Sequence, residues 1–518
     1  MGSESCIRDR RFTAAVSPGN GDRLVATATD AAGNTSEFSR AAPVSQTALG
    51  VNDLGDAPDA DPGDCLCAAA PGVCTLRAAL QTANACPGPQ AIGFAVAGTI
   101  APQTPLPALT NPAGIWIDGT SAPGARANSA PLSSPINAQL VVTLNGSGQV
   151  PEGLRLSAGR NRINGLAMIE FTGRALAIQS SNNVVSGNFI GLDTSGASGS
   201  FHQLVGVAVE NGAANNQIGG RQAADRNLIS GNLSAGVVIS GTGSSFNAVI
   251  GNSIGREATG AALPNAAEQQ VGVWMGGGAA SNRIGLAAPM EAGYAQTASS
   301  NLISGNRQAG IYLGAGASQT QVMNNTIGPA ADGQSLVVGG AQTAGVLIED
   351  AQANEIGRPG QANQISGNAL AGVRIKGSAA SQNRILANLI GPGSSGTQPL
   401  LDSQQQHGIV IEEGAHDNQV GDTASALVSW PGNIVRYNSY QGIVVRGETT
   451  LNNRLSGNIV MNGPGPAIDL DGDGLTPNDK DDPDAGPNRL QNSPEIFTAF
   501  YPDAEPGGPT IFSPISIT

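Results

Sequence analysis

The sequence is poor in aromatic and charged residues. Phe, Trp and Tyr make up 3% of its 518 residues, and Asp, Glu, Lys and Arg make up 12%. A β-propeller has four strands per blade and typically uses more aromatic side chains, so this composition disfavours it. The formal net charge of −14 and the isoelectric point near 4.6 argue against a partner with a phosphate backbone, and we expect no nucleic acid to bind.

Long apolar runs and histidines are also scarce. No stretch approaches the roughly 20 consecutive apolar residues of a membrane-spanning helix, so no membrane span is expected in this segment. Residues 1–11 contain no apolar stretch that would predict a signal peptide, and we interpret them as a non-native or truncated junction. The three histidines, His202, His407 and His416, form no Ser-His-Asp or Cys-His pattern.

Glycine is abundant, at 72 residues, and it marks an internal repeat. A triplet of the form Gly-Val/Ile-x-aliphatic recurs roughly every 27 to 38 residues, and an Asn-x-Ile-like triplet follows about 9 to 11 residues later. The Gly-led triplets begin at Gly206, Gly236, Gly272, Gly310, Gly345, Gly372, Gly408 and Gly442. The Asn-led ones begin at Asn216, Asn247, Asn282, Asn354, Asn383, Asn418 and Asn453, with Thr320 as the exception. Three short strands per unit, each bounded by Gly or Asn, indicate one turn of a solenoid.

This repeat predicts an all-β chain that folds as a right-handed parallel β-helix over residues 111–470. Its strands are short and lie too close together for crossover helices. Stacked coils would bring Val207, Val237 and Val273 into one aliphatic ladder, which no single coil could bury. Gly and Asn occupy the turns, where positive φ is needed, and stacked Asn amides can hydrogen-bond from coil to coil.

Residues 47–110 differ from the repeat and predict an N-terminal cap. A cap is expected because the exposed end of a solenoid would otherwise pair with other chains. The segment contains the clearest helix of the chain, over residues 75–85. Thr75 is its expected N-cap, and one face carries Leu76, Ala79, Leu80 and Ala83.

Three flanking segments have other expected roles. Residues 12–46 alternate in hydrophobicity around a turn and resemble the last hairpin of an immunoglobulin-like repeat. Residues 471–495 are expected to form an acidic closing loop. Residues 496–518 are interpreted as the start of a further, truncated domain.

The cap carries a family resemblance. VCTLRAALQTAN at 73–84, after an Asp-rich stretch, resembles the Cys-Ser-Leu-Arg-Glu-Ala motif that opens a group of bacterial exported right-handed β-helix proteins. IWIDGTSAPG at 115–124, the NLISGN coils and the closing DLDGDGLTPND…GPNRLQN at 469–492 also match, so the resemblance covers roughly residues 48–495. Ala78 departs from the acidic position of the motif, which would weaken a helix-capping contact. The resemblance implies the fold and export, and it assigns no catalytic residues.

Four of the five cysteines lie in the cap. Cys65, Cys67, Cys74 and Cys86 have a C-x-C-x6-C-x11-C spacing, which is not a usual zinc pattern, and no histidine lies nearby. In an exported protein two disulfides are therefore favoured over a zinc site. Their three possible pairings stay open.

The outward positions of the Gly-led strands form a candidate carbohydrate site. Trp274 and Tyr312 are outward aromatics on adjacent coils, about 5 Å apart along the axis, and Glu349 and Arg374 follow on the next coils. Loops on alternate coils are expected to form a wall beside this face, and hence a shallow groove; they are 192–205, 256–271, 329–344 and 392–407. Aromatic side chains in a groove can hold sugar rings. The alternative is that these loops cover the two rings as a small satellite core.

Charges alternate on one outward column: Glu349, Lys376, Glu412 and Arg446. Two carboxylates that act on a glycosidic bond lie roughly 5 to 9.5 Å apart. Glu349 and Glu412 are expected about 10 Å apart, two coils from one another, with a cation between them that keeps both ionised. A cross-coil salt ladder is therefore favoured over a catalytic pair, and no catalytic residue is assigned.

The closing loop suggests a structural calcium site. DLDGDG at 469–474 matches the first half of an oxygen-ligand calcium loop, but the twelfth position is Lys480. The candidate ligands are Asp469, Asp471, Asp473, Asp479 and Asp481. The alternatives are a solvated acidic loop and an Asp471–Arg446 ion pair that needs no metal.

Together these observations favour a non-enzymatic function. We interpret the chain as a structural or adhesive β-helix segment of a larger bacterial protein, secreted or at the cell surface, whose partner is a polysaccharide or surface glycan. The alternative is a polysaccharide lyase, glycoside hydrolase or epimerase, but a fold alone is only an analogy.

Overall fold

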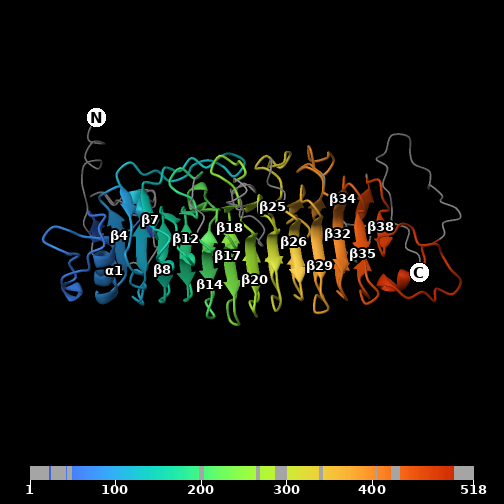
Figure 1. Ribbon diagram of the computed structural model, residues 1–518, viewed down its shortest axis with the longest axis horizontal. Coiled ribbons are helices and arrows are strands. Elements are labelled where there is room, and N and C mark those ends of the chain that lie inside the picture. Colours follow the sequence, from blue (N-terminus) through green and yellow to red (C-terminus); the bar gives the residue numbers. More distant parts are fainter. Residues whose placement is uncertain are drawn as a thin grey trace, which may run out of the picture.

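The chain winds into a right-handed parallel β-helix, as predicted. The computed structural model describes residues 49–197, 203–263, 269–285, 300–337, 342–403, 405–421, 432–461 and 463–494, with two-residue strands at 23–24 and 42–43. Three parallel sheets of 12, 11 and 13 strands run the length of an elongated rod, with helix α1 near one end and strand β38 near the other (Figure 1).

Each full coil contributes one strand to each sheet. The 12-stranded sheet contains β5 (Gly98–Ile100), β7 (Val142–Asn145), β10 (Ala167–Ile169), β13 (Phe189–Ile190), β16 (Leu228–Ile229), β19 (Ser253–Ile254), β22 (Leu302–Ile303), β25 (Thr326–Ile327), β28 (Gln364–Ile365), β31 (Leu389–Ile390), β34 (Ile434–Arg436) and β37 (Ile459–Met461). The 11-stranded sheet contains β8 (Glu152–Leu156), β11 (Arg174–Ile178), β14 (Val205–Val209), β17 (Ala235–Ser240), β20 (Val271–Gly276), β23 (Ala309–Leu313), β26 (Ala344–Glu349), β29 (Ala371–Lys376), β32 (His407–Glu412), β35 (Ile443–Val445) and β38 (Ile468–Leu470). The 13-stranded sheet contains β3 (Leu49–Val51), β4 (Gln90–Phe94), β6 (Ile115–Asp118), β9 (Arg162–Asn164), β12 (Val184–Ser186), β15 (Gln217–Gly219), β18 (Ala248–Ile250), β21 (Arg283–Ile284), β24 (Gln321–Val322), β27 (Glu355–Ile356), β30 (Arg384–Ile385), β33 (Gln419–Val420) and β36 (Arg454–Leu455).

The register between successive coils aligns their inward apolar side chains into a continuous core. The Gly-led strands form the 11-stranded sheet, where Val207 pairs with Val237 and Val237 with Val273. All three side chains are fully buried, and they belong to one hydrophobic cluster that extends from the cap to the last coils. The predicted aliphatic ladders are confirmed.

A ladder of buried asparagines precedes the 13-stranded sheet. Asn282 Oδ1 accepts both the backbone N–H of Asn247, at 2.9 Å, and its side-chain amide, at 3.0 Å. The other rungs repeat this pattern through Asn161, Asn183, Asn216, Asn354, Asn383, Asn418 and Asn453. Each Asn side chain therefore satisfies turn N–H groups of the preceding coil, as predicted. Thr320 interrupts the ladder because it has no amide, although its own N–H reaches Asn354.

Two further ladders of buried amide side chains lie at the other two corners of each coil. Before the 12-stranded sheet stand Asn188, Asn227, Asn252, Asn301, Asn325, Asn363, Asn388, Asn433 and Asn458. Before the 11-stranded sheet, Gln and Asn alternate through Gln203, Asn232, Gln269, Asn306, Gln342, Asn368, Gln405 and Asn438. The Gln members stand on the coils with long loops, and the sequence repeat did not reveal them.

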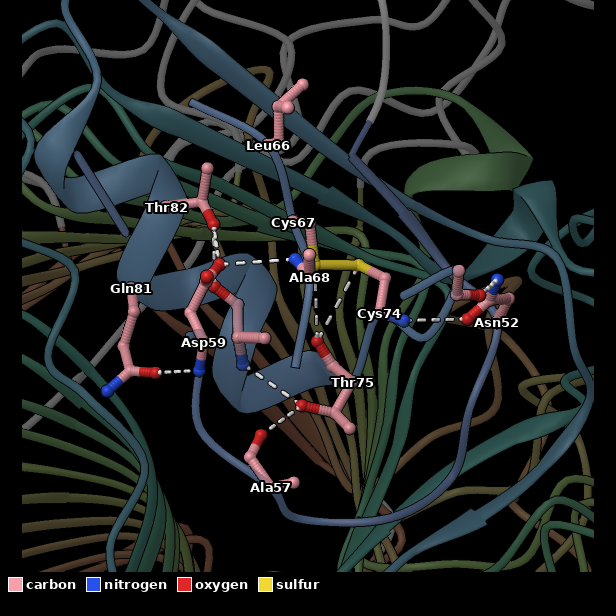
Figure 2. Close-up of a disulfide and its surroundings, with 12 residues drawn as sticks. Asn52, Ala57, Asp59, Leu66, Cys67, Ala68, Cys74, Thr75, Gln81 and Thr82 are labelled. Carbon is pink, nitrogen blue, oxygen red and sulfur yellow. Dashed lines mark hydrogen bonds between the residues drawn. A yellow bond between two sulfur atoms is a disulfide. The ribbon is translucent and has the colours of Figure 1, made fainter. Parts of the chain in front are cut away.

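The cap has the expected helix and two disulfides. Helix α1 (Leu76–Ala85) begins after Thr75, whose hydroxyl accepts the N–H of Ala78, and its apolar face joins the core cluster. The bridges are Cys65–Cys86 and Cys67–Cys74, which settles the pairing that the sequence left open. Beside the Cys67–Cys74 bridge, Asp59 accepts hydrogen bonds from Thr82 of the helix and from Ala68 N (Figure 2).

Arg77 ties the cap to the first coil. Its guanidinium makes two hydrogen bonds of 2.9 Å to Asp56 and also donates to the carbonyls of Thr104 and Pro105. Ala78, the departure from the motif, is a fully buried residue of the helix, and its N–H donates to the Thr75 hydroxyl, so the helix is capped without an acidic side chain at this position.

The same cap segment also contributes strands. β3, β4 and β5 pair into the sheets, so coiling begins at residue 49, inside the 47–110 segment. Most of residues 12–46 and all of 1–11 and 496–518 lie outside the described residues; within 12–46, β1 (Arg23–Leu24) pairs antiparallel with β2 (Ala42–Pro43). Within the described ranges, no helix is long and apolar enough to cross a membrane. Short 3-10 helices occur at η1 (Pro62–Asp64), η2 (Gly119–Ser121), η3 (Ala223–Asp225) and η6 (Pro487–Leu490).

The asparagine ladder predicts substitutions of opposite effect. Asn247→Leu would leave the N–H groups of Asn216 without their buried acceptor, and it should destabilise the protein by about 2–4 kcal/mol. Thr320→Asn would restore the missing amide and should stabilise it by about 1 kcal/mol. Denaturant midpoints of both variants measure the two effects. Loss of stability in both variants would contradict the proposed role of the ladder.

Candidate functional site

The outer face of the 11-stranded sheet presents its side chains in register. Trp274 on β20 pairs with Tyr312 on β23, which pairs with Leu347 on β26. Arg374 on β29 is the next residue of this column. A parallel column carries Glu349, Lys376 and Glu412. The structure therefore brings the four predicted carbohydrate-binding residues onto neighbouring coils of one face.

The two aromatic rings meet edge to face. Their centroids are 6.5 Å apart and their planes differ by 85°, so they form a T-shaped pair and not one flat platform. The Trp274 ring lies over Gly276 and Gly314, where a Cβ atom would approach ring atoms to 2.6 and 3.3 Å. Both side chains keep part of their surface in solvent. The glycines therefore make room for the tryptophan, and the rings still present apolar edges.

A hydrogen-bonded chain of polar groups continues from the aromatic pair. The Tyr312 hydroxyl donates to Glu349, and Lys376 Nζ lies 2.8 Å from the other carboxylate oxygen. The hydrogen bond from Lys376, and then that from Tyr312, lowers the pKa of Glu349, while the Glu349 carboxylate raises the pKa of Lys376. Burial and Glu349 raise the pKa of Tyr312. Each of these groups is held in its ordinary protonation state at neutral pH.

The predicted salt ladder is only partly right. Lys376 bridges to Glu349, but Glu412 pairs with Arg374 at 2.6 Å, and Glu413 lies 3.6 Å from both cations. Arg446 bonds to His407 instead of extending the ladder. Long side chains reach diagonally across the sheet, so column position alone does not fix the partner.

The long loops pack elsewhere than predicted. Their described parts cover the outer face of the 12-stranded sheet, where Ala258 and Leu263 contact apolar residues such as Phe189 and Leu228. Successive loops also bond to one another, as Ser394 N does to Gly333 O at 3.0 Å. The expected wall is therefore a cover for that sheet, because its outward apolar residues need one.

Two buried arginines hydrogen-bond to backbone carbonyls of segments that lie outside the coils. Arg226 donates to Ala130 O at 3.1 Å, and Arg256 donates to Pro329 O at 2.8 Å. Burial lowers the pKa of each guanidinium to about 10, so both remain charged at neutral pH. Both arginines therefore hold segments that cover the 12-stranded sheet in position.

A polar cluster that the sequence did not predict lies at the last coils. His407 is buried at the start of β32, and its ring centroid is 5.9 Å from that of Tyr440. Arg446 Nη2 lies 3.3 Å from His407 Nε2, and because a guanidinium only donates, this nitrogen accepts and the imidazole is neutral. Burial, and then Arg446, lowers the pKa of His407, while Glu412 and Asp469 oppose that shift.

The closing loop is organised without gathering its carboxylates. Asp469 is buried and accepts hydrogen bonds from Gln441 and from the N–H groups of Gly472 and Gly474. Asp479 bonds to Asn492, while no ion pair joins Asp471 to Arg446 among the described residues. Within the same part of the chain, no three Asp, Glu, His or Cys side chains come together as a metal site. The five predicted ligands, including Asp473 and Asp481, are therefore not brought together.

Comparison with known proteins finds similarity among solved structures but not among family profiles or curated sequences. No family profile matches the sequence, and no curated protein is significantly similar to it. Among solved structures, the chain is similar to a PL6 family polysaccharide lyase from Pseudopedobacter saltans, with 11% identity and a TM-score of 0.34. The match covers 81% of this chain and 96% of that one.

His407 predicts a loss of stability in acid. Its folded-state pKa lies below the ordinary 6.5, so the stabilising contribution of the neutral ring is complete above that value and is lost as pH falls through the folded pKa. His407→Gln should therefore flatten the decline in Tm below about pH 6.5. His416→Gln, which changes an exposed histidine beside Asp417, is the matched control and should keep the decline. Equal profiles in both variants would refute the assignment.

Calcium binding by the closing loop stays a prediction. Bound calcium would stabilise the last coil by ligand linkage, so excess calcium should raise Tm relative to chelator. Asp473→Asn with Asp479→Asn should abolish that difference. An unchanged Tm and no bound ion would leave a solvated loop that Asp469 organises through the backbone.

Proposed function

We propose that this chain is a non-catalytic, exported β-helix segment that contacts glycans through the outer face of its 11-stranded sheet. The observation that carries this proposal is the juxtaposition of the Trp274–Tyr312 pair with Glu349 and Arg374 on consecutive coils. Apolar ring edges next to hydrogen-bonding groups suit a sugar, which has both C–H faces and hydroxyls.

The charge arrangement supports binding over catalysis. A general acid needs a carboxyl whose pKa is raised toward neutral pH, but the pKa of Glu349 is lowered. Lys376 stays protonated beside that carboxylate, and Arg374 forms an ion pair with Glu412, so neither is free to act as a base. In this state the groups can donate and accept hydrogen bonds from hydroxyls without moving protons.

Export is supported by the cap. Both disulfides join cysteines of the segment that precedes the first full coils, and stable disulfides are typical of oxidising compartments. A rod-shaped solenoid of this length suits a structural or adhesive role in a larger surface protein, with the partner a polysaccharide or a surface glycan.

The test combines a glycan array with thermal melting. Trp274→Ala should weaken binding of the recognised glycan about tenfold, or about 1.4 kcal/mol, because it removes the larger ring. The Tm should stay nearly unchanged, since the ring is part-exposed and rests on glycines. Trp116→Ala, at a part-exposed tryptophan of the 13-stranded sheet, is the matched control and should retain binding.

Two results would overturn the proposal. A large loss of stability in Trp274→Ala with unchanged glycan binding would make the ring a packing element only. Cleavage of a uronate polymer by the wild-type protein, lost in Glu349→Gln or Glu412→Gln, would show that the face is catalytic.

A further inference from the structure

The outer face of the 13-stranded sheet carries a row of arginines, which we call the arginine row. Arg283 on β21, Arg384 on β30 and Arg454 on β36 occupy the same outward position on their coils, and all three are exposed. Arg162 on β9 holds this position nearer the cap and is half-buried. A chain with a net charge of −14 thus has one face whose outward column is rich in cations.

These arginines differ from the charges on the 11-stranded sheet. There, Glu349, Lys376, Arg374 and Glu412 neutralise one another in ion pairs. Among the described residues, no carboxylate lies within ion-pair distance of Arg162, Arg283, Arg384 or Arg454. The one acidic residue of the row, Glu355, is bound by Arg358 at 2.6 Å. In the part of the chain that the structure describes, the charges of the first face pair with one another, and these four arginines do not.

The register spaces the cations apart. From Arg283 the row continues through Gln321 and Glu355 to Arg384, and then through Gln419 to Arg454. With strands about 4.8 Å apart, the guanidinium groups are spaced about 14 and 10 Å along the rod. No two arginines are neighbours, so the row avoids direct repulsion. Arg283, Arg384 and Arg454 are exposed, and within the described ranges none of them forms an ion pair that would stabilise the fold.

We propose that the arginine row binds a linear anionic polysaccharide that lies along the rod. Positive charges at intervals along a sheet that runs the length of the rod match a chain that carries carboxylate or sulfate groups at intervals. Arginine presents a planar fork of donors that suits either anion, and Gln321 and Gln419 add neutral hydrogen-bonding groups between the charges. The site is separate from the Trp274–Tyr312 face and does not depend on the function proposed for that face.

A polysaccharide is favoured over a nucleic acid because the exposed part of the row offers no stacking platform. Between Arg283 and Arg454 its other rungs are Gln321, Glu355 and Gln419, and none is an aromatic residue on which a base could stack.

The experiment titrates the intact chain with polygalacturonate, dextran sulfate, neutral dextran and single-stranded DNA at low and at physiological salt. Wild type should bind one or both anionic polysaccharides, and the two arms identify the preferred anion. The triple variant Arg283→Gln, Arg384→Gln, Arg454→Gln should bind roughly tenfold more weakly. Its dependence of log K on log salt should fall by up to about one per arginine.

Controls separate charge at this site from charge in general. Glutamine already stands on two rungs of the row, so the substitutions suit the fold, and the single variant Arg384→Gln provides a milder test. Arg307→Gln removes an exposed arginine outside the row and should leave binding unchanged. In the same titration the triple variant tests the row and Trp274→Ala tests the proposed glycan face, so failure of one is distinguishable from failure of the other.

Three outcomes would overturn the inference. Absence of binding to both anionic polymers would leave the row a solvated surface. An equal loss in Arg307→Gln would show non-specific attraction. Binding of DNA as strong as that of the polysaccharides would reassign the row to nucleic acid.

Discussion

The hydrogen bond from each turn to the amide of the next coil is the constraint on which the rest of the structure depends. A solenoid must bend three times per coil, and each bend would bury backbone N–H groups without partners. Asn247 and its equivalents supply a buried acceptor for these groups one coil away. Because that acceptor lies in the next coil, satisfying the turns fixes the register, and the register in turn aligns every outward column.

Most of the fold could be predicted because short sequence motifs recur once in each coil. Gly206 and its equivalents lie within the strands of the 11-stranded sheet and do not have the expected positive φ; glycine is needed there because a Cβ atom would come too close to the next coil. The Asn-led triplets mark the corner before the 13-stranded sheet. The alternating Gln members of the third ladder, such as Gln269, were missed because they follow loops of variable length. Loop packing was predicted wrongly for a related reason: whether a loop covers one sheet or borders another depends on contacts such as Ala258 with Phe189, which no repeat encodes.

The candidate site was predictable in position but not in detail. Pleat alternation places Trp274, Tyr312, Glu349 and Arg374 on one face, and the structure agrees. Side-chain partners depend on torsions that sequence does not report, so Arg374 meets Glu412 while Arg446 turns to His407. No sequence motif marks His407, because its partners Tyr440 and Arg446 lie on the next coil. The five aspartates of the closing loop looked alike in sequence. In the structure, Asp469 lies in the last strand, and its carboxylate accepts the backbone N–H groups of Gly472 and Gly474.

The orientation of the sheets also gives the rod a mechanical character. Interstrand hydrogen bonds run along the long axis, and helix α1 and strand β38 lie near its opposite ends (Figure 1). Tension between those ends would pull on the bonds along their own direction, so load would open one coil boundary at a time and not shear a whole sheet. Covering loops also bond across more than one boundary, as Ser394 N does to Gly333 O two coils earlier, so they couple the boundaries that they span. On the asparagine ladder, the boundary at which Thr320 replaces asparagine lacks a side-chain amide, so it would part more readily than its neighbours on that ladder.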